Sequence, residues 1–422
     1  MIKKIKVIDL QIGMFIEDMN APYTDHPFLT NQKRVKSVRD IDLLLQHAID
    51  EVYIDTDKGL DSPKAEAAYE ADERVRTAME KDMSDAEEVP PEEEPVSVER
   101  PAELQGFREE VQRAKQVYGQ AKNMVKDLLG EARLGRSVDG ERAQVVVNGM
   151  VDSIFRNQDA LLSLTRLKSY DDYTFQHSLN VAVMTVSLGR NLGLVKDELS
   201  RLGVGAILHD IGKMQIPEQI LNKPGRYTDD EFAIMKTHTL KGAAILMNAP
   251  DVEKESTAVA LNHHERFGGK GYPRGLQGMG IGKFGLISAI VDVYDAITSD
   301  RVYHKGLPSH QAIQKIYEWA QTDFYPVYVQ KFIQCLGVYP IGTVALLDTG
   351  ELGVVYNQNH SDLLRPWVRL VRKSGGEPMS PPVDADLREP DRTGVKKFMR
   401  TISSVHMPHE VGIDVEKVLT AA

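Results

Sequence analysis

The chain has 422 residues and a net charge of −11, with 42% hydrophobic and 27% charged residues. This composition is typical of a globular protein of two or three domains and excludes a disordered or fibrous chain. The single cysteine, Cys335, excludes an intramolecular disulfide framework and indicates a reducing compartment. No apolar run approaches the roughly 20 residues that span a bilayer, and the N-terminus lacks the apolar core of a signal peptide. We therefore expect a cytoplasmic protein with no membrane span.

Residues 1–58 are expected to form a small N-terminal α+β domain with a sensory or regulatory role. Alternation and β-branched residues predict strands within 3–16 and 51–57. Between them, residues 38–49 place apolar side chains at helical spacing, which predicts a short helix.

Most of the acidity lies in one stretch that follows this domain. Residues 81–105 contain nine acids, two bases and four prolines, a balance of −7. We therefore expect residues 59–105 to be an acidic, Pro-rich linker. The net charge argues against nucleic-acid binding. Because the charge is so local, a site elsewhere can still be positive.

Residues 106–168 are expected to form two long connecting helices. From Phe107 onward apolar residues recur every three or four positions, and a second helical pattern runs from near Asp139 to Leu167. These helices could transmit a signal or pair across a homodimer. They could equally pack on the next domain, and the sequence leaves both alternatives open.

Residues 169–340 are dominated by helix-length apolar patterns separated by turn-rich breaks, and Thr228 with the acids after it predicts a helix start. After Pro340, short strands around glycine turns predict a β-rich extension over 341–422. The fold class is therefore mainly α, with a small N-terminal α+β domain and a short β-rich C-terminal tail. The expected helices of the central region lie at 174–194, 197–212, 228–247, 255–267 and 286–299.

Seven histidine and aspartate side chains in this helical region are candidate metal ligands. A lone histidine on an apolar helix is more often a core residue, so the prediction depends on the ordered set. Nitrogen and carboxylate oxygen ligands suit first-row metals such as iron, manganese, zinc and nickel. Seven ligands are too many for one zinc site and match two ions that share water and substrate oxygens. The candidates are His177, His209, Asp210, His238, His263, His264 and Asp292.

The spacing around Asp210 predicts how two ions could be held. Neighbours in a helix point about 100° apart, so His209 could bind one metal while Asp210 bridges to a second. Two such ions can hold a hydroxide and stabilise a displacement at phosphorus. Lys213 lies three residues after Asp210 and suits a phosphate oxygen. On position alone it is more simply a helix-end lysine beside Gly212, but the surrounding ligands favour the phosphate role.

These residues lie within motifs that resemble the HD-GYP subgroup of the HD-domain metal-dependent phosphohydrolases. The resemblance covers roughly residues 170–335 and rests mainly on three motifs: HDIGK at 209–213, HHER at 263–266 and GYP at 271–273. The resemblance implies a helical HD fold and hydrolysis of cyclic di-GMP to pGpG, and commonly on to GMP, by a metal-activated hydroxide. Further matching segments are YTFQHS at 173–178, ILNKPG at 220–225, KTHTLKG at 236–242 and DVYDAITSDRVY at 292–303.

The resemblance also implies roles for individual residues. All seven candidate ligands occupy the family's metal positions, and Asp210 and Lys213 take catalytic roles. Two divalent ions are expected, most often iron or manganese, with nickel, zinc or cobalt as other candidates. The glycine turn forms a lip over the nucleotide pocket, where glycine permits close backbone approach. The implied substrate-binding residues are Arg266, Gly271, Tyr272, Pro273 and Arg301.

Three positions depart from the family pattern. Gly268 stands where Asp is usual, which could loosen the lip and slow turnover. Tyr173 stands where a subset has a glutamate that completes a three-metal site, so two metals are favoured. His304 stands where Arg or Lys is frequent, which could weaken a phosphate contact.

We therefore predict a cyclic di-GMP phosphodiesterase, and two other readings remain open. One is a weak or inactive receptor that binds cyclic di-GMP or a diguanylate cyclase, and the other is an HD phosphohydrolase for another nucleotide. The variant Gly268→Asp is expected to separate turnover from a receptor role.

The N-terminal segment resembles a small domain of unknown function that precedes HD-GYP in some bacterial proteins, on the residues IKVIDLQIGMFI, HPF and VYIDTDKG. GTVALLDTGELGVVY resembles the strand pair that often follows the HD-GYP helices.

Overall fold

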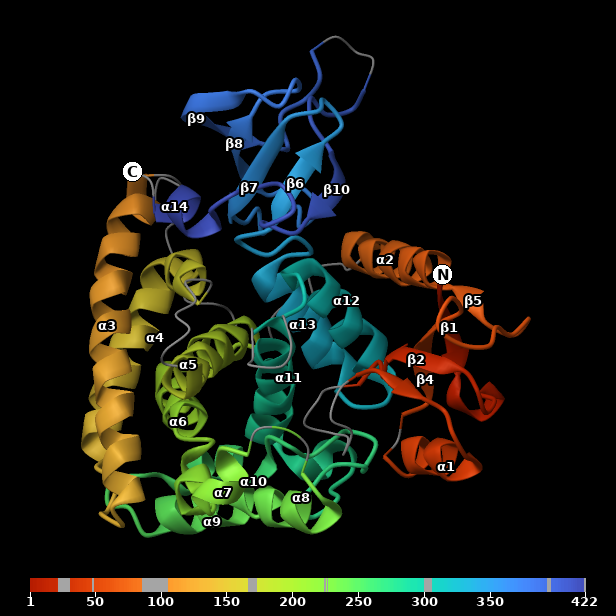
Figure 1. Cartoon of the computed structure of the whole chain (residues 1–422). Helices are drawn as coiled ribbons and strands as arrows, with labels where there is room; N and C mark the ends of the chain where they lie inside the picture. The colour runs from red at the N-terminus through yellow and green to blue at the C-terminus, as the bar shows by residue number, and fades with distance from the viewer. Residues whose placement is uncertain are drawn as a thin grey trace.

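The computed structural model describes residues 1–21, 31–47, 49–85, 105–165, 173–223, 225, 227–299, 306–392 and 396–420. A bundle of helices forms the centre, and a small antiparallel sheet lies at each end of the chain (Figure 1). The predicted fold class, mainly α with two small β-containing ends, is confirmed. Within the described ranges, no helix is both long and apolar enough to cross a membrane.

The N-terminal sheet is antiparallel and has its own small apolar core, to which Leu44 of helix α1 (Val38–Gln46) contributes. The strand pattern predicted within 3–16 is present, but as two strands rather than one continuous strand. The chain leaves the sheet in a 3-10 turn at Val7–Asp9 and reaches Gly13 at a φ of 103° before it re-enters. The strands, in the order β3-β2-β4-β1-β5, are β1 (Ile2–Lys6), β2 (Phe15–Asp18), β3 (Lys33–Arg34), β4 (Glu51–Asp55) and β5 (Glu66–Ala67).

Helix α2 (Ala68–Asp85) occupies part of the segment that we expected to be linker. It packs against helix α12 (Ser309–Glu318) of the central bundle, where Tyr317 donates a 2.5 Å hydrogen bond to Asp82. The Pro-rich stretch around residues 89–101 lies outside the described residues. The division of the chain into domains stays a prediction.

Helices α3 (Gln105–Arg133) and α4 (Gly140–Leu164) are the two expected connecting helices. Asp139 caps α4 by accepting a hydrogen bond from the backbone of Arg142. Their apolar residues, including Leu128 and Met150, are buried in the main core of this chain. The packing alternative therefore accounts for these faces, and the homodimer through residues 106–168 stays a prediction.

The central bundle continues through helices that wrap around α5 and α11 (Figure 1). The helix predicted at 228–247 is two helices that meet at Thr237, and Thr228 caps the first with a reciprocal bond to Glu231. The remaining elements are α5 (Tyr173–Asn191), α6 (Lys196–Ile207), the 3-10 helix η4 (Ile211–Gln215), α7 (Glu218–Leu221), α8 (Asp229–Lys236), α9 (His238–Met247), α10 (Lys254–Asn262), the 3-10 helix η5 (Gly278–Ile281), α11 (Lys283–Thr298), the 3-10 helix η6 (Trp319–Gln321) and α13 (Pro326–Leu336).

The C-terminal sheet has five antiparallel strands in the order β10-β6-β7-β8-β9. The short strands predicted after Pro340, in GTVALLDTGELGVVYNQ and PWVRLVRK, are present and pair with one another. Its inner residues join the main core, so this sheet is continuous with the bundle in packing. The elements are β6 (Val344–Leu347), β7 (Leu352–Asn357), β8 (Trp367–Arg372), β9 (Pro378–Asp386), β10 (Ile402–His406) and helix α14 (Val415–Thr420).

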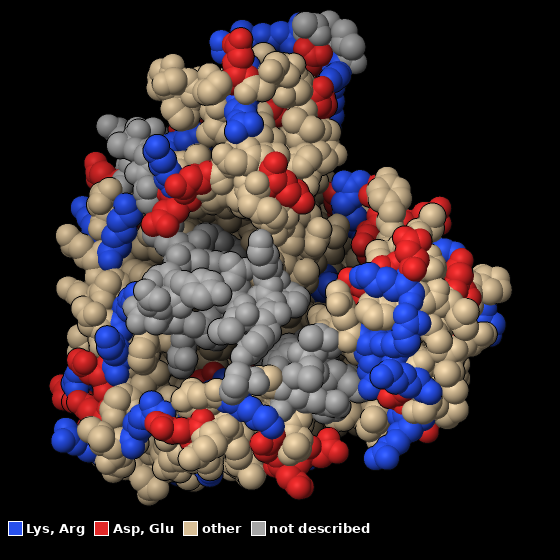
Figure 2. All heavy atoms as spheres, viewed as in Figure 1, with Lys and Arg blue, Asp and Glu red and all other residues tan. Residues whose placement is uncertain are grey.

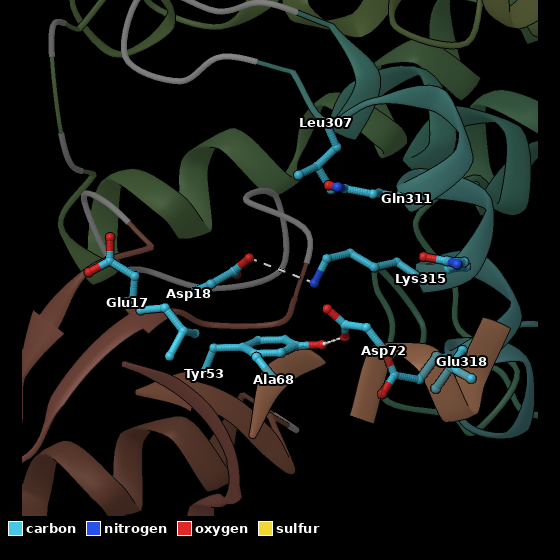
Figure 3. A pocket seen from close by; sticks show the side chains of 12 residues that line it. Glu17, Asp18, Tyr53, Ala68, Asp72, Leu307, Gln311, Lys315 and Glu318 are labelled. Atoms are coloured by element: carbon cyan, nitrogen blue, oxygen red, sulfur yellow. Dashed lines mark hydrogen bonds and ion pairs between the residues drawn. The ribbon is translucent and has the colours of Figure 1, made fainter. Parts of the chain in front are cut away.

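A pocket of about 200 Å³ lies between the N-terminal domain and α12 (Figure 3). Lys315 reaches across it from α12, with its Nζ 3.7 Å from Asp18 and 2.7 Å from Asn20. The Tyr53 hydroxyl donates to Asp72 at 2.7 Å. Charged and polar side chains thus connect the N-terminal domain to the bundle.

Side chains of both signs are interspersed over the outer surface in Figure 2. The described surface in that view therefore shows mixed charge, which does not define a nucleic-acid-binding face.

Candidate metal centre

The structure brings all seven candidate ligands into one buried site, where none is more than 6% exposed. One cluster contains His177 of α5, His209 from the turn after α6 and Asp292 of α11, with ligand atoms within 4.8 Å of one another. The Nε2 of His177 lies 3.1 Å from Oδ1 of Asp292, and the Nε2 of His209 lies 3.7 Å from the same oxygen. Three elements that are distant in sequence therefore supply one set of converging donors.

A second cluster contains His238, the first residue of α9, together with His263 and His264 at the end of α10. The Nε2 atoms of His238 and His263 are 3.4 Å apart. The Nδ1 of His264 lies 3.8 Å from Oδ2 of Asp292, so Asp292 faces both clusters. The adjacent histidines of the HHER motif thus serve as a pair of donors at a helix end.

Asp210 lies between the two clusters and turns one oxygen toward each. Its Oδ2 is 3.4 Å from Nε2 of His209 and 3.7 Å from Nε2 of His177. Its Oδ1 is 3.4 Å from Nε2 of His238 and 3.8 Å from Nε2 of His263. The helical geometry expected for His209 and Asp210 is wrong, because both lie in the turn between α6 and η4. The turn, rather than a helical offset of 100°, aims the two side chains.

Hydrogen bonds fix the ring orientation of four imidazoles. The Nδ1–H of His209 donates to the carbonyl of Ala206, and that of His238 donates to Met235, each at 2.7 Å. His263 donates from Nδ1 to Ala260 at 3.0 Å. In His177, the partner of Nδ1 is instead the carboxylate of Asp295 at 2.7 Å. Because Nδ1 carries the proton in each ring, the Nε2 lone pair is left for a metal.

The electrostatics of the centre favour the protonation states that bind metals. Burial lowers the pKa of His238 to about 4, and burial with the neighbouring His209 lowers that of His263 to about 3. Burial alone would raise the pKa of Asp210, but the Lys213 ammonium and nearby imidazoles hold it well below its usual value. At neutral pH His238 and His263 are therefore neutral and Asp210 is ionised, as metal ligands must be.

Three buried ligand atoms have no hydrogen-bond partner among the described residues: Nε2 of His209, Oδ1 of Asp210 and Nδ1 of His264. An unpaired buried donor or acceptor is costly, so such atoms normally have a partner. All three face the centre of the two clusters. Divalent first-row ions fit this donor set, which contains only imidazole nitrogens and carboxylate oxygens.

Lys213 lies at the edge of the centre, in η4, with its Nζ 2.5 Å from Oδ2 of Asp210. Its side chain is 27% exposed, so Lys213 is less buried than any of the seven candidate ligands. The preceding Gly212 is in very close backbone contact with α9, since a Cβ there would lie 1.9 Å from the carbonyl oxygen of His238. This contact holds the HDIGK turn against the helix that carries a ligand.

The GYP loop is fastened to the back of the ligand pair. Glu265 is fully buried and accepts backbone hydrogen bonds from Arg274 and Leu276, both at 2.9 Å. A Cβ at Gly271 would lie 2.3 Å from the backbone nitrogen of Arg266, so the close approach expected for this glycine is present. Tyr272 stacks on the His264 ring with centroids 4.6 Å apart and an interplanar angle of 26°. The loop therefore places the GYP tyrosine directly on a metal-ligand candidate.

Gly268 has a structural explanation that the sequence did not supply. Its backbone nitrogen donates to the carbonyl of Thr322 at 2.8 Å. A Cβ at this position would lie 2.6 Å from that same oxygen. The segment after η6 thus occupies the space that an aspartate would need, so Gly268→Asp cannot serve as a simple gain-of-rate variant.

One of the implied substrate residues, Arg266, is buried. Arg266 is only 4% exposed and donates to the backbone carbonyls of His263 and Glu265, which argues against a direct substrate contact. Arg301, His304 and the side chain of Tyr173 lie outside the described residues, and their implied roles stay predictions. Gly271 and Tyr272 lie beside His264, and the substrate-binding roles implied for them and for Pro273 stay predictions.

Sequence reasoning missed the residues that support the ligands. Asp295 accepts from Nδ1 of His177 at 2.7 Å and from Asn180 at 3.1 Å, and Glu265 holds the GYP loop. The only available signal was position: Asp295 lies three residues after Asp292, and Asn180 three after His177, on the same helix faces. Neither spacing by itself distinguishes a supporting residue from a solvated one.

Comparison with protein families divides the chain into two matched regions. A model described as an HD domain matches residues 152–326, and a model described as a domain of unknown function, DUF3391, matches residues 2–143. The second match extends well beyond the 1–58 segment that we expected and includes helices α2 and α3.

Among curated proteins, a cyclic di-GMP phosphodiesterase of Pseudomonas aeruginosa is 37% identical over 374 residues, which cover 88% of this chain and 85% of that protein. A cyclic di-GMP phosphodiesterase of Thermotoga maritima is 37% identical over 42% of this chain and 48% of its own length. A 3'3'-cGAMP-specific phosphodiesterase of Vibrio cholerae is 36% identical over 36% of each chain. The first of these relatives is similar along nearly the whole chain, including the region before the HD domain.

Proposed function

Since the chain belongs to the HD-GYP family of cyclic di-GMP phosphodiesterases, we propose that it hydrolyses cyclic di-GMP at a two-metal centre built around Asp210. Family membership makes the chain a metal-dependent phosphodiesterase. The proposal concerns how many metal ions bind, which metal they are and which nucleotide is released. Iron or manganese are the first candidates, with nickel, zinc and cobalt as alternatives.

The position of Asp210 carries the proposal. Its two oxygens face different clusters, each at 3.4 Å from the nearest imidazole nitrogen. A carboxylate in that position could hold both ions, and each cluster would supply further ligands to one of them. When bound, the ions would activate the attacking water and neutralise charge on the phosphate.

The residues of this chain would then position the phosphodiester and support the displacement. Water adds to phosphorus, the bond from phosphorus to the ribose 3'-oxygen breaks, and that oxygen gains a proton, which gives linear pGpG. A second hydrolysis of the remaining internal diester would give two molecules of GMP. The Lys213 ammonium beside Asp210 is placed to attract a non-bridging phosphate oxygen and to stabilise charge that develops in the transition state.

Tyr272 would shape the nucleotide side of the same pocket. The Tyr272 ring stacks on His264, and its centroid lies 6.5 Å from that of Phe232. The Lys236 ammonium lies 5.8 Å from the centroid of the Tyr272 ring. An aromatic surface beside a cation suits a purine next to its phosphate. The close approach of Gly271 to Arg266 and the backbone bond from Tyr272 to His264 fix the loop that carries this ring.

The test is turnover of cyclic di-GMP under anaerobic conditions with Mn(II) or Fe(II), with products separated by chromatography and bound metal counted in the same sample. Linear nucleotide together with about two ions per chain would support the proposal. Full metal loading with nucleotide binding but no product would identify a receptor. Faster hydrolysis of 3'3'-cGAMP than of cyclic di-GMP would replace the substrate assignment.

A further inference from the structure

We propose that Tyr118 of α3 is a positioning residue for the metal ligand His177 and acts through Asn180 and Asp295. The inference rests on the proposed metal centre and deepens it. Tyr118 lies in the region matched by DUF3391, residues 2–143. Under this inference it supports the active site of the neighbouring HD domain.

A continuous chain of hydrogen bonds joins these four side chains. The Tyr118 hydroxyl lies 2.8 Å from Oδ1 of Asn180, the Nδ2 of Asn180 lies 3.1 Å from Oδ1 of Asp295, and Nδ1 of His177 lies 2.7 Å from Oδ2 of Asp295. Asn180, Asp295 and His177 are 4%, 3% and 6% exposed. Bonds in such a dry environment are strong and costly to break.

The donor directions along the chain are mutually consistent. Asp295 accepts on both oxygens, so Asn180 must turn its NH₂ group toward Asp295 and its carbonyl toward Tyr118. Tyr118 then donates its hydroxyl proton to that carbonyl. His177 donates from Nδ1, so its Nε2 carries no proton and lies 3.1 Å from Oδ1 of Asp292. Loss of the Tyr118 donor would leave the Asn180 carbonyl without this buried partner and free the amide to rotate away from Asp295.

This support is specific to one cluster. The rings of His238 and His263 are held by carbonyls close in their own sequence, Met235 and Ala260. His177 instead donates to Asp295 of α11. Asp295 also accepts from Asn180 of α5, and Asn180 accepts from Tyr118 of α3. A disturbance at Tyr118 should therefore weaken the ion bound by His177, His209 and Asp292 and leave the other ion in place.

The test is a chelator-competition titration of the full chain with Mn(II), together with a count of bound metal. The variant Tyr118→Phe removes only the hydroxyl group and should weaken one class of Mn(II) site by about 3–10-fold, the effect of one buried hydrogen bond. Asp295→Asn should weaken the same class by about 10–100-fold. The matched control is Tyr317→Phe, which removes a hydroxyl bonded to Asp82 at the α2–α12 contact and should change neither class.

A double variant decides whether the residues act as one chain. If Tyr118 works through Asp295, Tyr118→Phe should add nothing to the loss caused by Asp295→Asn. Multiplying effects, unchanged Mn(II) affinity in Tyr118→Phe, or equal weakening of both classes would overturn the inference. Asn180→Ala breaks the chain from the α5 side and should match Tyr118→Phe or exceed it. Because the readout is metal affinity, loss of the proposed substrate activity would not be mistaken for failure of this inference.

Discussion

The metal centre and the contact between the N-terminal domain and α12 are both polar, but they are built differently. In the centre, seven ligands are almost fully buried, and four imidazoles are held by hydrogen bonds at Nδ1. At the contact, Lys315 and Asp18 are 15% and 31% exposed, and their charged atoms are 3.7 Å apart. Buried polar groups require partners with good geometry, whereas partly exposed ion pairs contribute little each. Substitutions should therefore be severe in the first region and mild in the second.

The largest effect is expected from His209→Ala combined with Asp210→Ala. Loss of the residue that faces both clusters should remove bound metal and lower turnover by more than about 10³-fold, while the helical content stays unchanged. Activity, metal content and circular dichroism measured together would check this. The exposed pair His409→Ala with Glu410→Ala is the matched control. Turnover at the normal rate without metal would contradict the two-metal mechanism.

Lys213→Ala should separate metal binding from rate. The substitution removes the ammonium beside Asp210 but no ligand, so metal should stay bound while kcat falls by about 10²–10³-fold. Steady-state kinetics with a metal count would show the split. Lys241→Ala, which removes an exposed bond to the Gln215 carbonyl, is the control. Metal loss in proportion to the rate would mean that Lys213 mainly supports Asp210.

The metal-free protein should lose stability as the pH falls from about 7 to about 4. Unfolded imidazoles take up protons below about 6.5. His238 and His263 have folded pKa values near 4 and 3, so over this window the unfolded state binds more protons and is favoured. Thermal unfolding against pH measures the effect.

Two variants assign that pH dependence to a region. Burial also lowers the pKa of His310 to about 4, so this residue adds a loss of the same sign. His263→Gln and His310→Gln should each reduce the slope of stability against pH. An unchanged slope in His263→Gln would mean that the metal centre does not contribute.

Gly268→Ala should destabilise the GYP loop without raising the rate. The added Cβ would meet the Thr322 carbonyl oxygen at 2.6 Å, and a clash of this kind costs about 1–3 kcal/mol. Differential scanning calorimetry and kcat should be compared with Gly280→Ala, where a Cβ meets nothing within 4 Å. A faster and equally stable Gly268 variant would restore the idea that this glycine limits catalysis.

The smallest effect is expected at the N-terminal contact. Lys315→Met keeps the aliphatic stem and removes the charge near Asp18 and Asn20, so unfolding free energy should fall by less than about 1 kcal/mol. Denaturant titration compared with Lys126→Met, on the exposed side of α3, would measure it. A loss of several kcal/mol would show that the two regions do not differ as described.

Ligand identity was predictable, but the grouping of ligands was not. Imidazole and carboxylate chemistry identifies His177 and Asp292 as donors wherever they lie. Their position in one cluster depends on how α5 packs against α11. The spacing of apolar residues along the sequence does not show which helices pack together. For the same reason the turn at His209 and Asp210 was mistaken for helix, because apolar spacing continues through the end of α6.

The supporting contacts were beyond sequence reasoning because they join distant positions. Tyr118 and Asn180 are 62 residues apart, and each looks ordinary on its own helix face. Gly268 was read as a missing aspartate because nothing in the sequence places Thr322 beside it. The long helices, in contrast, follow from periodicity and a cap at Asp139. Local sequence patterns therefore predicted the helices, the strands and the candidate metal ligands. The contacts that position those ligands depend on residues distant in sequence, which local patterns do not show.

The most direct measurement is anomalous diffraction from crystals of the Mn(II)-loaded protein, recorded at the manganese edge. We expect two peaks about 3.5–4 Å apart, one beside each histidine cluster, with Asp210 between them. A single peak in fully loaded protein, or two peaks that do not share Asp210, would contradict the two-metal centre.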